Sequence, residues 1–125
     1  LDISGGTSLV DGSGISRGNL TTAASICGLL ENIYFNDSVY EDFYNTLSVA
    51  GNDGTLADRK NNRMYNYIFH GKTGTLRGVS SLSGYLSTEK GNELIVSIIF
   101  NFTKGSSELY KNTEDLIIEY LAETK

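Results

Sequence analysis

The spacing of apolar residues in the first half of the chain predicts two helices. From Leu20 onward, apolar or small side chains recur every three or four residues, as on one helix face: positions 20, 23, 24, 27, 30 and 34. Thr21 or Thr22 is the candidate N-cap, because a threonine hydroxyl accepts a hydrogen bond from a free amide of the first turn. Apolar residues at every fourth position indicate a second, shorter helix: Val39, Phe43 and Leu47.

A third helix is predicted at the C-terminal end. Its expected apolar face consists of Leu109, Thr113, Leu116, Ile117 and Tyr120. The expected solvent face carries the acidic side chains of Glu114, Asp115 and Glu119. We therefore expect this helix to pack on the rest of the domain through the first of these faces.

Three strand-like runs lie between the second and third helices. They cover residues 65–73, 78–87 and 94–102, and the last run is almost uniformly apolar. Such a run is typical of a central strand that is covered on both faces. Short turns between the runs predict an antiparallel sheet of three strands with flanking helices, an α+β fold.

Composition narrows the class of protein. The chain has 125 residues, about one domain, and a net charge of −5, which argues against a general role in nucleic-acid binding. No run reaches the ~18 apolar residues of a membrane span, and no signal peptide is visible. Because the chain starts at Leu1 rather than at a methionine, we expect a fragment or a processed product.

The single cysteine and the single histidine limit the chemistry. Cys27 has no partner for an intrachain disulfide, and its helical spacing predicts a place in the core. His70 alone excludes a multi-histidine metal site and argues against a Ser-His-Asp triad. No metal and no cofactor are predicted. A plain strand position is the favoured interpretation of His70, and a place on the rim of a cleft is the alternative.

The most informative short motif is Lys72-Thr73-Gly74-Thr75, which follows an aromatic run. A lysine beside threonine hydroxyls can hold a carboxylate through charge-assisted hydrogen bonds. Glycine allows a ligand to approach the backbone, and an edge strand can pair with an extended peptide. The alternative interpretation is an ordinary turn with a solvated lysine.

Other blocks accompany this motif in a fixed order. They are Asp11-Gly12-Ser13-Gly14-Ile15-Ser16-Arg17 with Asn19, then Leu47–Leu56 with Arg59, then Lys72–Leu76, then Gly84-Tyr85. This order resembles the C-terminal part of the D-alanyl-D-alanine carboxypeptidase/endopeptidase family, the low-molecular-mass class C penicillin-binding proteins (peptidase family S13). The family pattern reads roughly DGSGLSR-x-N, LPVAG-x-DGTL, KTGTL-x-GV and GY. Ser48 stands where the family usually has proline.

The resemblance implies a partial penicillin-binding-protein/β-lactamase-like transpeptidase fold. Residues 1–125 would be a single partial domain, with the remaining strands and a helical subdomain upstream. The family's Ser-x-x-Lys and Ser-x-Asn motifs precede the first block, and only ten residues precede Asp11. Ser87 and Lys90 have the Ser-x-x-Lys spacing, but they follow Lys72 and lie beside turn residues, so we interpret this match as chance.

The resemblance also implies roles for individual residues. Lys72 would supply positive potential, and the Thr75 N–H would complete an oxyanion hole for attack by an upstream serine. The hydroxyls of Thr73 and Thr75 would bind the terminal carboxylate of a peptidoglycan peptide or a β-lactam. Gly74 would give clearance, and Leu76 would line the pocket. The implied location is the periplasm or envelope of a bacterium.

Two blocks allow more than one interpretation. Asp53 and Arg59 are candidate contacts to the peptide stem, and a turn-stabilising role for Asp53 is equally open. The first block could orient catalytic groups, although we favour loop stabilisation by its residues: Asp11, Gly12, Ser13, Gly14, Ser16, Arg17 and Asn19.

Three functions follow from these patterns. The leading one is the C-terminal segment of a serine carboxypeptidase, inactive without its upstream part and marginally soluble because of an exposed strand edge. The second is a non-catalytic binding or scaffolding module of cell-wall machinery. The third is a β-lactamase-like hydrolase, against which the first two sequence blocks argue.

Overall fold

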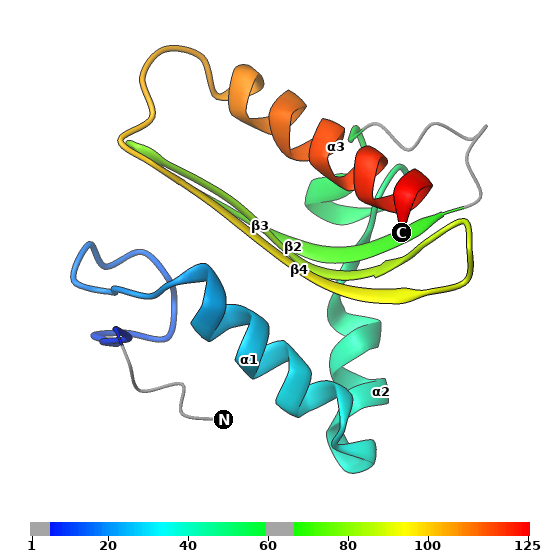
Figure 1. Ribbon diagram of the computed structural model, residues 1–125. Helices are drawn as coiled ribbons and strands as arrows, with labels where there is room; N and C mark the ends of the chain where they lie inside the picture. The colour runs from blue at the N-terminus through cyan, green and yellow to red at the C-terminus, as the bar shows by residue number, and fades with distance from the viewer. Residues whose placement is uncertain (1–5, 60–66) are drawn as a thin grey trace.

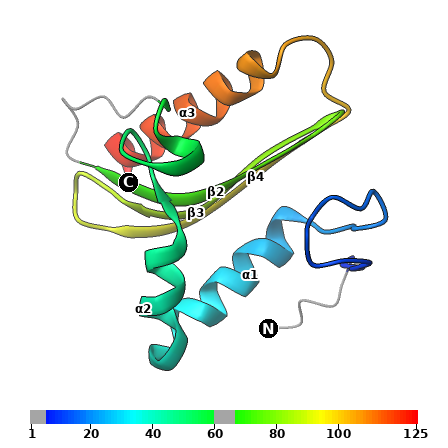
Figure 2. The ribbon, with the colours of Figure 1, turned by 180° about the vertical axis from the view of Figure 1, so that it is seen from behind.

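A computed structural model describes residues 6–59 and 67–125 of the chain. Its elements in order are α1 (Ala23–Tyr34), α2 (Asp37–Thr46), β1 (Ser48–Val49), a 3₁₀ turn η1 (Gly54–Leu56), β2 (Ile68–Leu76), β3 (Val79–Ser87), β4 (Glu93–Asn101) and α3 (Ser107–Thr124). Helix α3 covers one face of the sheet, and α1 and α2 lie on the other (Figures 1 and 2). The predicted α+β class with an antiparallel sheet and flanking helices is confirmed.

The sheet has one more strand than the sequence predicts. Its order is β1-β2-β3-β4, and each neighbouring pair is antiparallel. The additional strand β1 pairs only with His70 and Gly71, and two residues are too few to show an alternating pattern. The predicted beginning of the first long strand, residues 65 and 66, lies outside the described residues. Its end at Leu76 places Lys72–Thr75 within a strand, so the interpretation of these residues as a turn is wrong.

The hydrophobic core lies between the sheet and α3. Ile118 and Ala122 of the helix join a cluster of buried side chains from the strands and from the segment around η1, residues 50–59. The other members are Ala50, Leu56, Tyr67, Phe69, Leu82, Leu86 and Val96. The second half of α3 is therefore fixed against the centre of the sheet.

The predicted apolar face of α3 is wrong for three of its five residues. Leu109, Leu116 and Tyr120 are 62, 58 and 64 % exposed, whereas Glu114 is 1 % exposed and faces the sheet. A prediction from helical periodicity places acidic residues in solvent. The Glu114 carboxylate is instead buried and pairs with Arg59 and Ser80. The solvent side of α3 therefore carries apolar side chains that no described residue covers.

The last strand also departs from expectation. The apolar run predicts a central strand, but β4 lies at the end of the sheet order and most of its side chains are only half-buried. No other strand in residues 6–59 and 67–125 pairs with its outer edge. Apolar content therefore correctly marks a strand but does not tell where that strand lies in the sheet.

On the opposite face of the sheet, Tyr85 connects β3 to α1. Its side chain is 2 % exposed, and its hydroxyl donates a hydrogen bond of 2.8 Å to the Leu30 carbonyl. Burial raises the pKa of Tyr85 to about 12, so the hydroxyl keeps its proton. Thr22 is the N-cap of α1, as predicted, and accepts a bond from the Ser25 amide. Cys27 is half-buried rather than a full member of the core.

His70 connects the sheet to α2. Its ring stacks on Tyr44, with 4.1 Å between ring centroids and 21° between ring planes. The Nδ1 atom is buried and has no hydrogen-bond partner among the described residues. Burial lowers the pKa of His70 below its ordinary value of 6.5, and the opposing effect of Asp53 and Glu93 is smaller. The folded protein therefore favours the neutral imidazole.

Replacing Tyr85 with phenylalanine tests the connection between β3 and α1. Tyr85→Phe keeps the packing but removes a buried hydrogen bond, which typically contributes about 0.5–1.5 kcal/mol to the free energy of unfolding. We expect a loss of that size in urea unfolding followed by circular dichroism. Tyr120→Phe is the control because its side chain is 64 % exposed. Equal stabilities for the two variants would contradict the assignment.

The pH dependence of stability tests the position of His70. Because its folded pKa is depressed, its contribution to stability is fully present above the unfolded pKa of about 6.5 and is lost as the pH falls below it. His70→Phe keeps a ring against Tyr44 but has no titrating group there. When the pH falls from about 7.5 to 5.5, we expect the free energy of unfolding to decrease less in this variant than in the original protein. As the chain has one histidine, its NMR titration is unambiguous, and a pKa at or above 6.5 would contradict this account.

Candidate active site

Three separated sequence blocks meet around the second half of β2. The Thr73 hydroxyl bonds to the Thr55 hydroxyl at 2.9 Å, which joins β2 to the segment around η1. The Arg17 guanidinium donates to the Arg77 carbonyl at 3.2 Å, which joins the N-terminal loop to the turn after β2. The fold thus brings together the blocks that the sequence singled out.

The second half of β2 has an open edge. Strand β1 pairs with β2 only as far as Gly71, and no strand in the described part of the chain pairs with the outer edge from Lys72 onward. The Phe69 carbonyl accepts from the Ala50 amide across this edge at 3.0 Å. Because backbone groups alternate sides in antiparallel pairing, the N–H groups of Thr73 and Thr75 point to the same edge.

The side chains of the motif lie on both faces of the strand. Alternation places Lys72 on the side of α1 and α2 with His70, and Thr73 and Thr75 on the side of α3. The exposed Lys72 ammonium donates to the Thr73 carbonyl at 2.7 Å. The edge therefore combines a cation, two hydroxyls and free backbone donors.

Gly74 meets a constraint from within the protein. A Cβ atom at this position would lie 2.5 Å from the Ser81 hydroxyl on β3. A larger residue would therefore displace Ser81 or the edge of β2. Clearance for a ligand at Gly74 stays a prediction.

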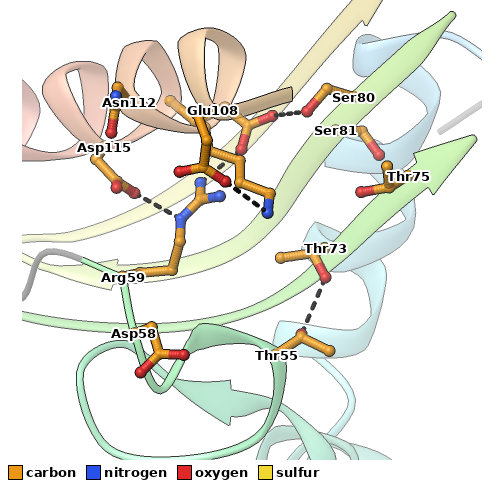
Figure 3. Close-up of a pocket in the computed structure, with 12 residues that line it drawn as sticks. Thr55, Asp58, Arg59, Thr73, Thr75, Ser80, Ser81, Glu108, Asn112 and Asp115 are labelled. Carbon is orange, nitrogen blue, oxygen red and sulfur yellow. Dashed lines mark hydrogen bonds and ion pairs between the residues drawn. The ribbon is translucent and has the colours of Figure 1, made fainter. Parts of the chain in front are cut away.

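A pocket of about 470 Å³ opens on the α3 side of the motif. Figure 3 shows Thr73 and Thr75 on one side of it and residues of α3 on the other. Its lining consists of Thr55, Asp58, Arg59, Thr73, Thr75, Ser80, Ser81, Glu108, Lys111, Asn112, Glu114 and Asp115. The two threonine side chains thus border a polar cavity on this face of the sheet.

Arg59 is held by two carboxylates in the wall of this pocket. Its Nη2 atom lies 2.5 Å from Glu114 Oε2, and its Nε atom lies 2.8 Å from Asp115 Oδ1. The Arg59 side chain is 8 % exposed. The Ser80 hydroxyl donates to Glu114 Oε1 at 2.8 Å. A contact of Arg59 to substrate stays a prediction, and the sequence reasoning missed Glu114 and Ser80.

The N-terminal block forms a loop built around Asp11. The Asp11 carboxylate accepts from the side chain and backbone of Ser13, from the backbone of Gly14 and Ser16, and from the Asn19 side chain. The bond from Asn19 is the main reason why the pKa of Asp11 lies below its ordinary value. Gly14 has a φ of 77°, a conformation that favours glycine. These bonds suit the favoured loop-stabilising interpretation.

The remaining candidates lie around the same strand. The Asp53 carboxylate accepts from the Val49 amide at 2.7 Å, a contact that stabilises the turn. Leu76 lines a second cavity, of about 570 Å³, between the N-terminal loop and the sheet, where Arg17 also lies. Ser87 ends β3, and the Lys90 ammonium donates to the Thr124 carbonyl. Ser87 and Lys90 thus do not share a helical turn.

The described residues contain neither a cluster of metal ligands nor a membrane-spanning helix. Within residues 6–59 and 67–125, no group of three or more histidine, cysteine, aspartate or glutamate side chains could hold a metal ion. None of the helices in this described part is both long and apolar enough to cross a bilayer.

Comparison with curated proteins gives close relatives. The chain is 41 % identical over 98 residues to the penicillin-sensitive carboxypeptidase A of Dictyostelium discoideum, covering 74 % of this chain and 19 % of the relative. It is 39 % identical over 124 residues to a D-alanyl-D-alanine carboxypeptidase of Actinomadura sp. (strain R39), covering 94 % and 22 %. The chain thus spans about a fifth of the length of the curated relatives it matches.

A solved structure shares the fold. Penicillin-binding protein 4 (dacB) of Haemophilus influenzae, in a complex with a novel β-lactam, superposes with a TM-score of 0.79 at 28 % identity. The match covers 95 % of this chain and 29 % of that one. The model of the D-Ala-D-Ala carboxypeptidase 3 (S13) family matches residues 2–124, nearly the whole chain. The chain belongs to this family of D-Ala-D-Ala carboxypeptidases.

Proposed function

We propose that this chain is the C-terminal segment of a serine D-alanyl-D-alanine carboxypeptidase/endopeptidase that acts on peptidoglycan peptides and binds penicillins. The observation that carries the proposal is the open edge of β2. There, Thr73 and Thr75 present two hydroxyls beside a pocket, their backbone donors point outward, and the Lys72 cation lies on the other face of the same edge. An extended peptide that ends in a carboxylate fits such an edge, because it can pair with the strand while the hydroxyls hold its end.

The reaction would be acyl transfer to a serine upstream of this chain. The serine oxygen attacks the carbonyl of the penultimate D-alanine, the terminal D-alanine leaves, and water then releases the peptide from the acyl-enzyme. The Thr75 N–H would stabilise the oxyanion together with the amide of that serine, since it points to the open edge. Lys72 would hold positive potential beside the reacting groups.

The same proposal accounts for the surfaces that this chain leaves uncovered. An upstream strand would pair with the outer edge of β4, and further upstream residues would cover Leu109, Leu116 and Tyr120. The greater length of the relatives supports this division of the catalytic domain. Without those parts, the 125 residues would lack the nucleophile and would be inactive. A peptidoglycan substrate implies work in the periplasm or cell envelope.

Loss of the Lys72 charge tests the proposed function. In the longer protein that carries the serine, we expect Lys72→Ala to slow acylation by a fluorescent penicillin on the order of 10²-fold, because a positive group at the developing charge is lost. The fold should survive, since the side chain is exposed. Lys90→Ala, at an exposed turn position, is the matched control.

Three outcomes would contradict the proposal. Equal acylation rates for Lys72→Ala and the original protein would remove Lys72 from the site. No acylation of the original protein would favour the alternative, a non-catalytic binding or scaffolding module, and fast turnover of the penicillin would favour a β-lactamase-like hydrolase.

A further inference from the structure

Glu114 contacts two different elements of the pocket wall. Its Oε1 atom accepts the Ser80 hydroxyl at 2.8 Å, and its Oε2 atom lies 2.5 Å from the Arg59 guanidinium. The side chain is 1 % exposed, so no solvent replaces either partner if it is lost. A buried carboxylate with both oxygens engaged fixes the relative position of its partners more tightly than a solvated one.

The first contact leads to Thr75. Ser80 lies directly opposite Thr75 in the register of β2 and β3. Cross-strand partners on one face are neighbours, about 4.5–5.5 Å apart at Cβ. Because α3 holds Ser80 through Glu114, it also fixes the part of β3 that supports Thr75.

The second contact leads to Thr73. Arg59 is the last described residue of the segment around η1, and its backbone amide donates to the Leu56 carbonyl at 3.0 Å. Within that segment, the Thr55 hydroxyl bonds to the Thr73 hydroxyl at 2.9 Å. Figure 3 shows Arg59 bonded to Asp115 and Thr55 bonded to Thr73 around the same pocket.

We propose that Glu114 is a positioning residue that sets the hydroxyls of Thr73 and Thr75 for the carboxylate of the substrate. The inference rests on the proposed function. Glu114 is distant in sequence from both threonines and does not contact them directly, so it would act through Ser80 and Arg59. Its loss would reduce the preference for ligands that carry a carboxylate, and not simply the amount of folded protein.

Glu114→Gln weakens both contacts while keeping the volume of the side chain. The amide carries no charge to hold the Arg59 guanidinium, and its NH2 group only donates, so the Ser80 hydroxyl would have to turn from donor to acceptor. Ser80→Ala removes only the contact toward Thr75. Glu123→Gln changes the same functional group at an exposed position of the same helix and serves as the control.

The test compares acylation of the longer protein by benzylpenicillin with acylation by its methyl ester, which lacks the charged carboxylate. Rates are referred to the number of reactive molecules, so the ratio of the two rates does not depend on the folded fraction. We expect Glu114→Gln to lower the preference for the acid on the order of tenfold, because small displacements of positioned groups carry losses of up to about 10²-fold. Ser80→Ala should lower it less, and Glu123→Gln should leave it unchanged.

Each outcome has a definite meaning. An unchanged preference in Glu114→Gln and Ser80→Ala, with penicillin still attached, would overturn the positioning role and leave the proposed function intact. If Glu114→Gln yields no reactive molecules, Ser80→Ala decides alone, and an unchanged preference there overturns the inference. No adduct on the original protein would overturn the proposed function itself.

Discussion

The carboxylate of Glu114 places a charge almost out of reach of water, and much of one face of the sheet is arranged around it. Desolvating a charge costs several kcal/mol unless its oxygens are paired, and breaking a buried pair typically costs about 3–5 kcal/mol. Ser80 and Arg59 meet that requirement from β3 and from the segment around η1. The pairing thus ties α3, the sheet and the segment that touches Thr73 into one arrangement.

The same carboxylate explains why the sequence misled about α3. Periodicity assigns acidic residues to solvent, so the predicted orientation of α3 faces Glu114 outward. The same prediction places Leu109 and Leu116 against the sheet, whereas both are exposed. The three long strands were predicted well, because short strand-like runs separated by turn residues, the last of them almost uniformly apolar, have few other solutions. Strand β1 was missed, since a two-residue strand has no pattern of its own.

The motif residues were found from sequence because their chemistry is local: a lysine, two threonines and a glycine in one strand. What sequence could not supply was their orientation. Alternation along β2 separates Lys72 from the two threonines, and the short pairing with β1 leaves the edge open beyond Gly71. Arg59 pairs with Glu114 and Asp115, which lie more than fifty positions further along the chain, and such a pairing leaves no local pattern in the sequence. A role for Arg59 was therefore predicted only from the family resemblance.

The central claim is that this edge is one side of an active site whose nucleophile lies upstream. Intact-mass analysis after penicillin treatment, with peptide mapping, tests it on this chain and on the longer protein. The account predicts an adduct only on the longer protein, on a serine before Leu1. An adduct within these 125 residues, or none on the longer protein, would contradict it.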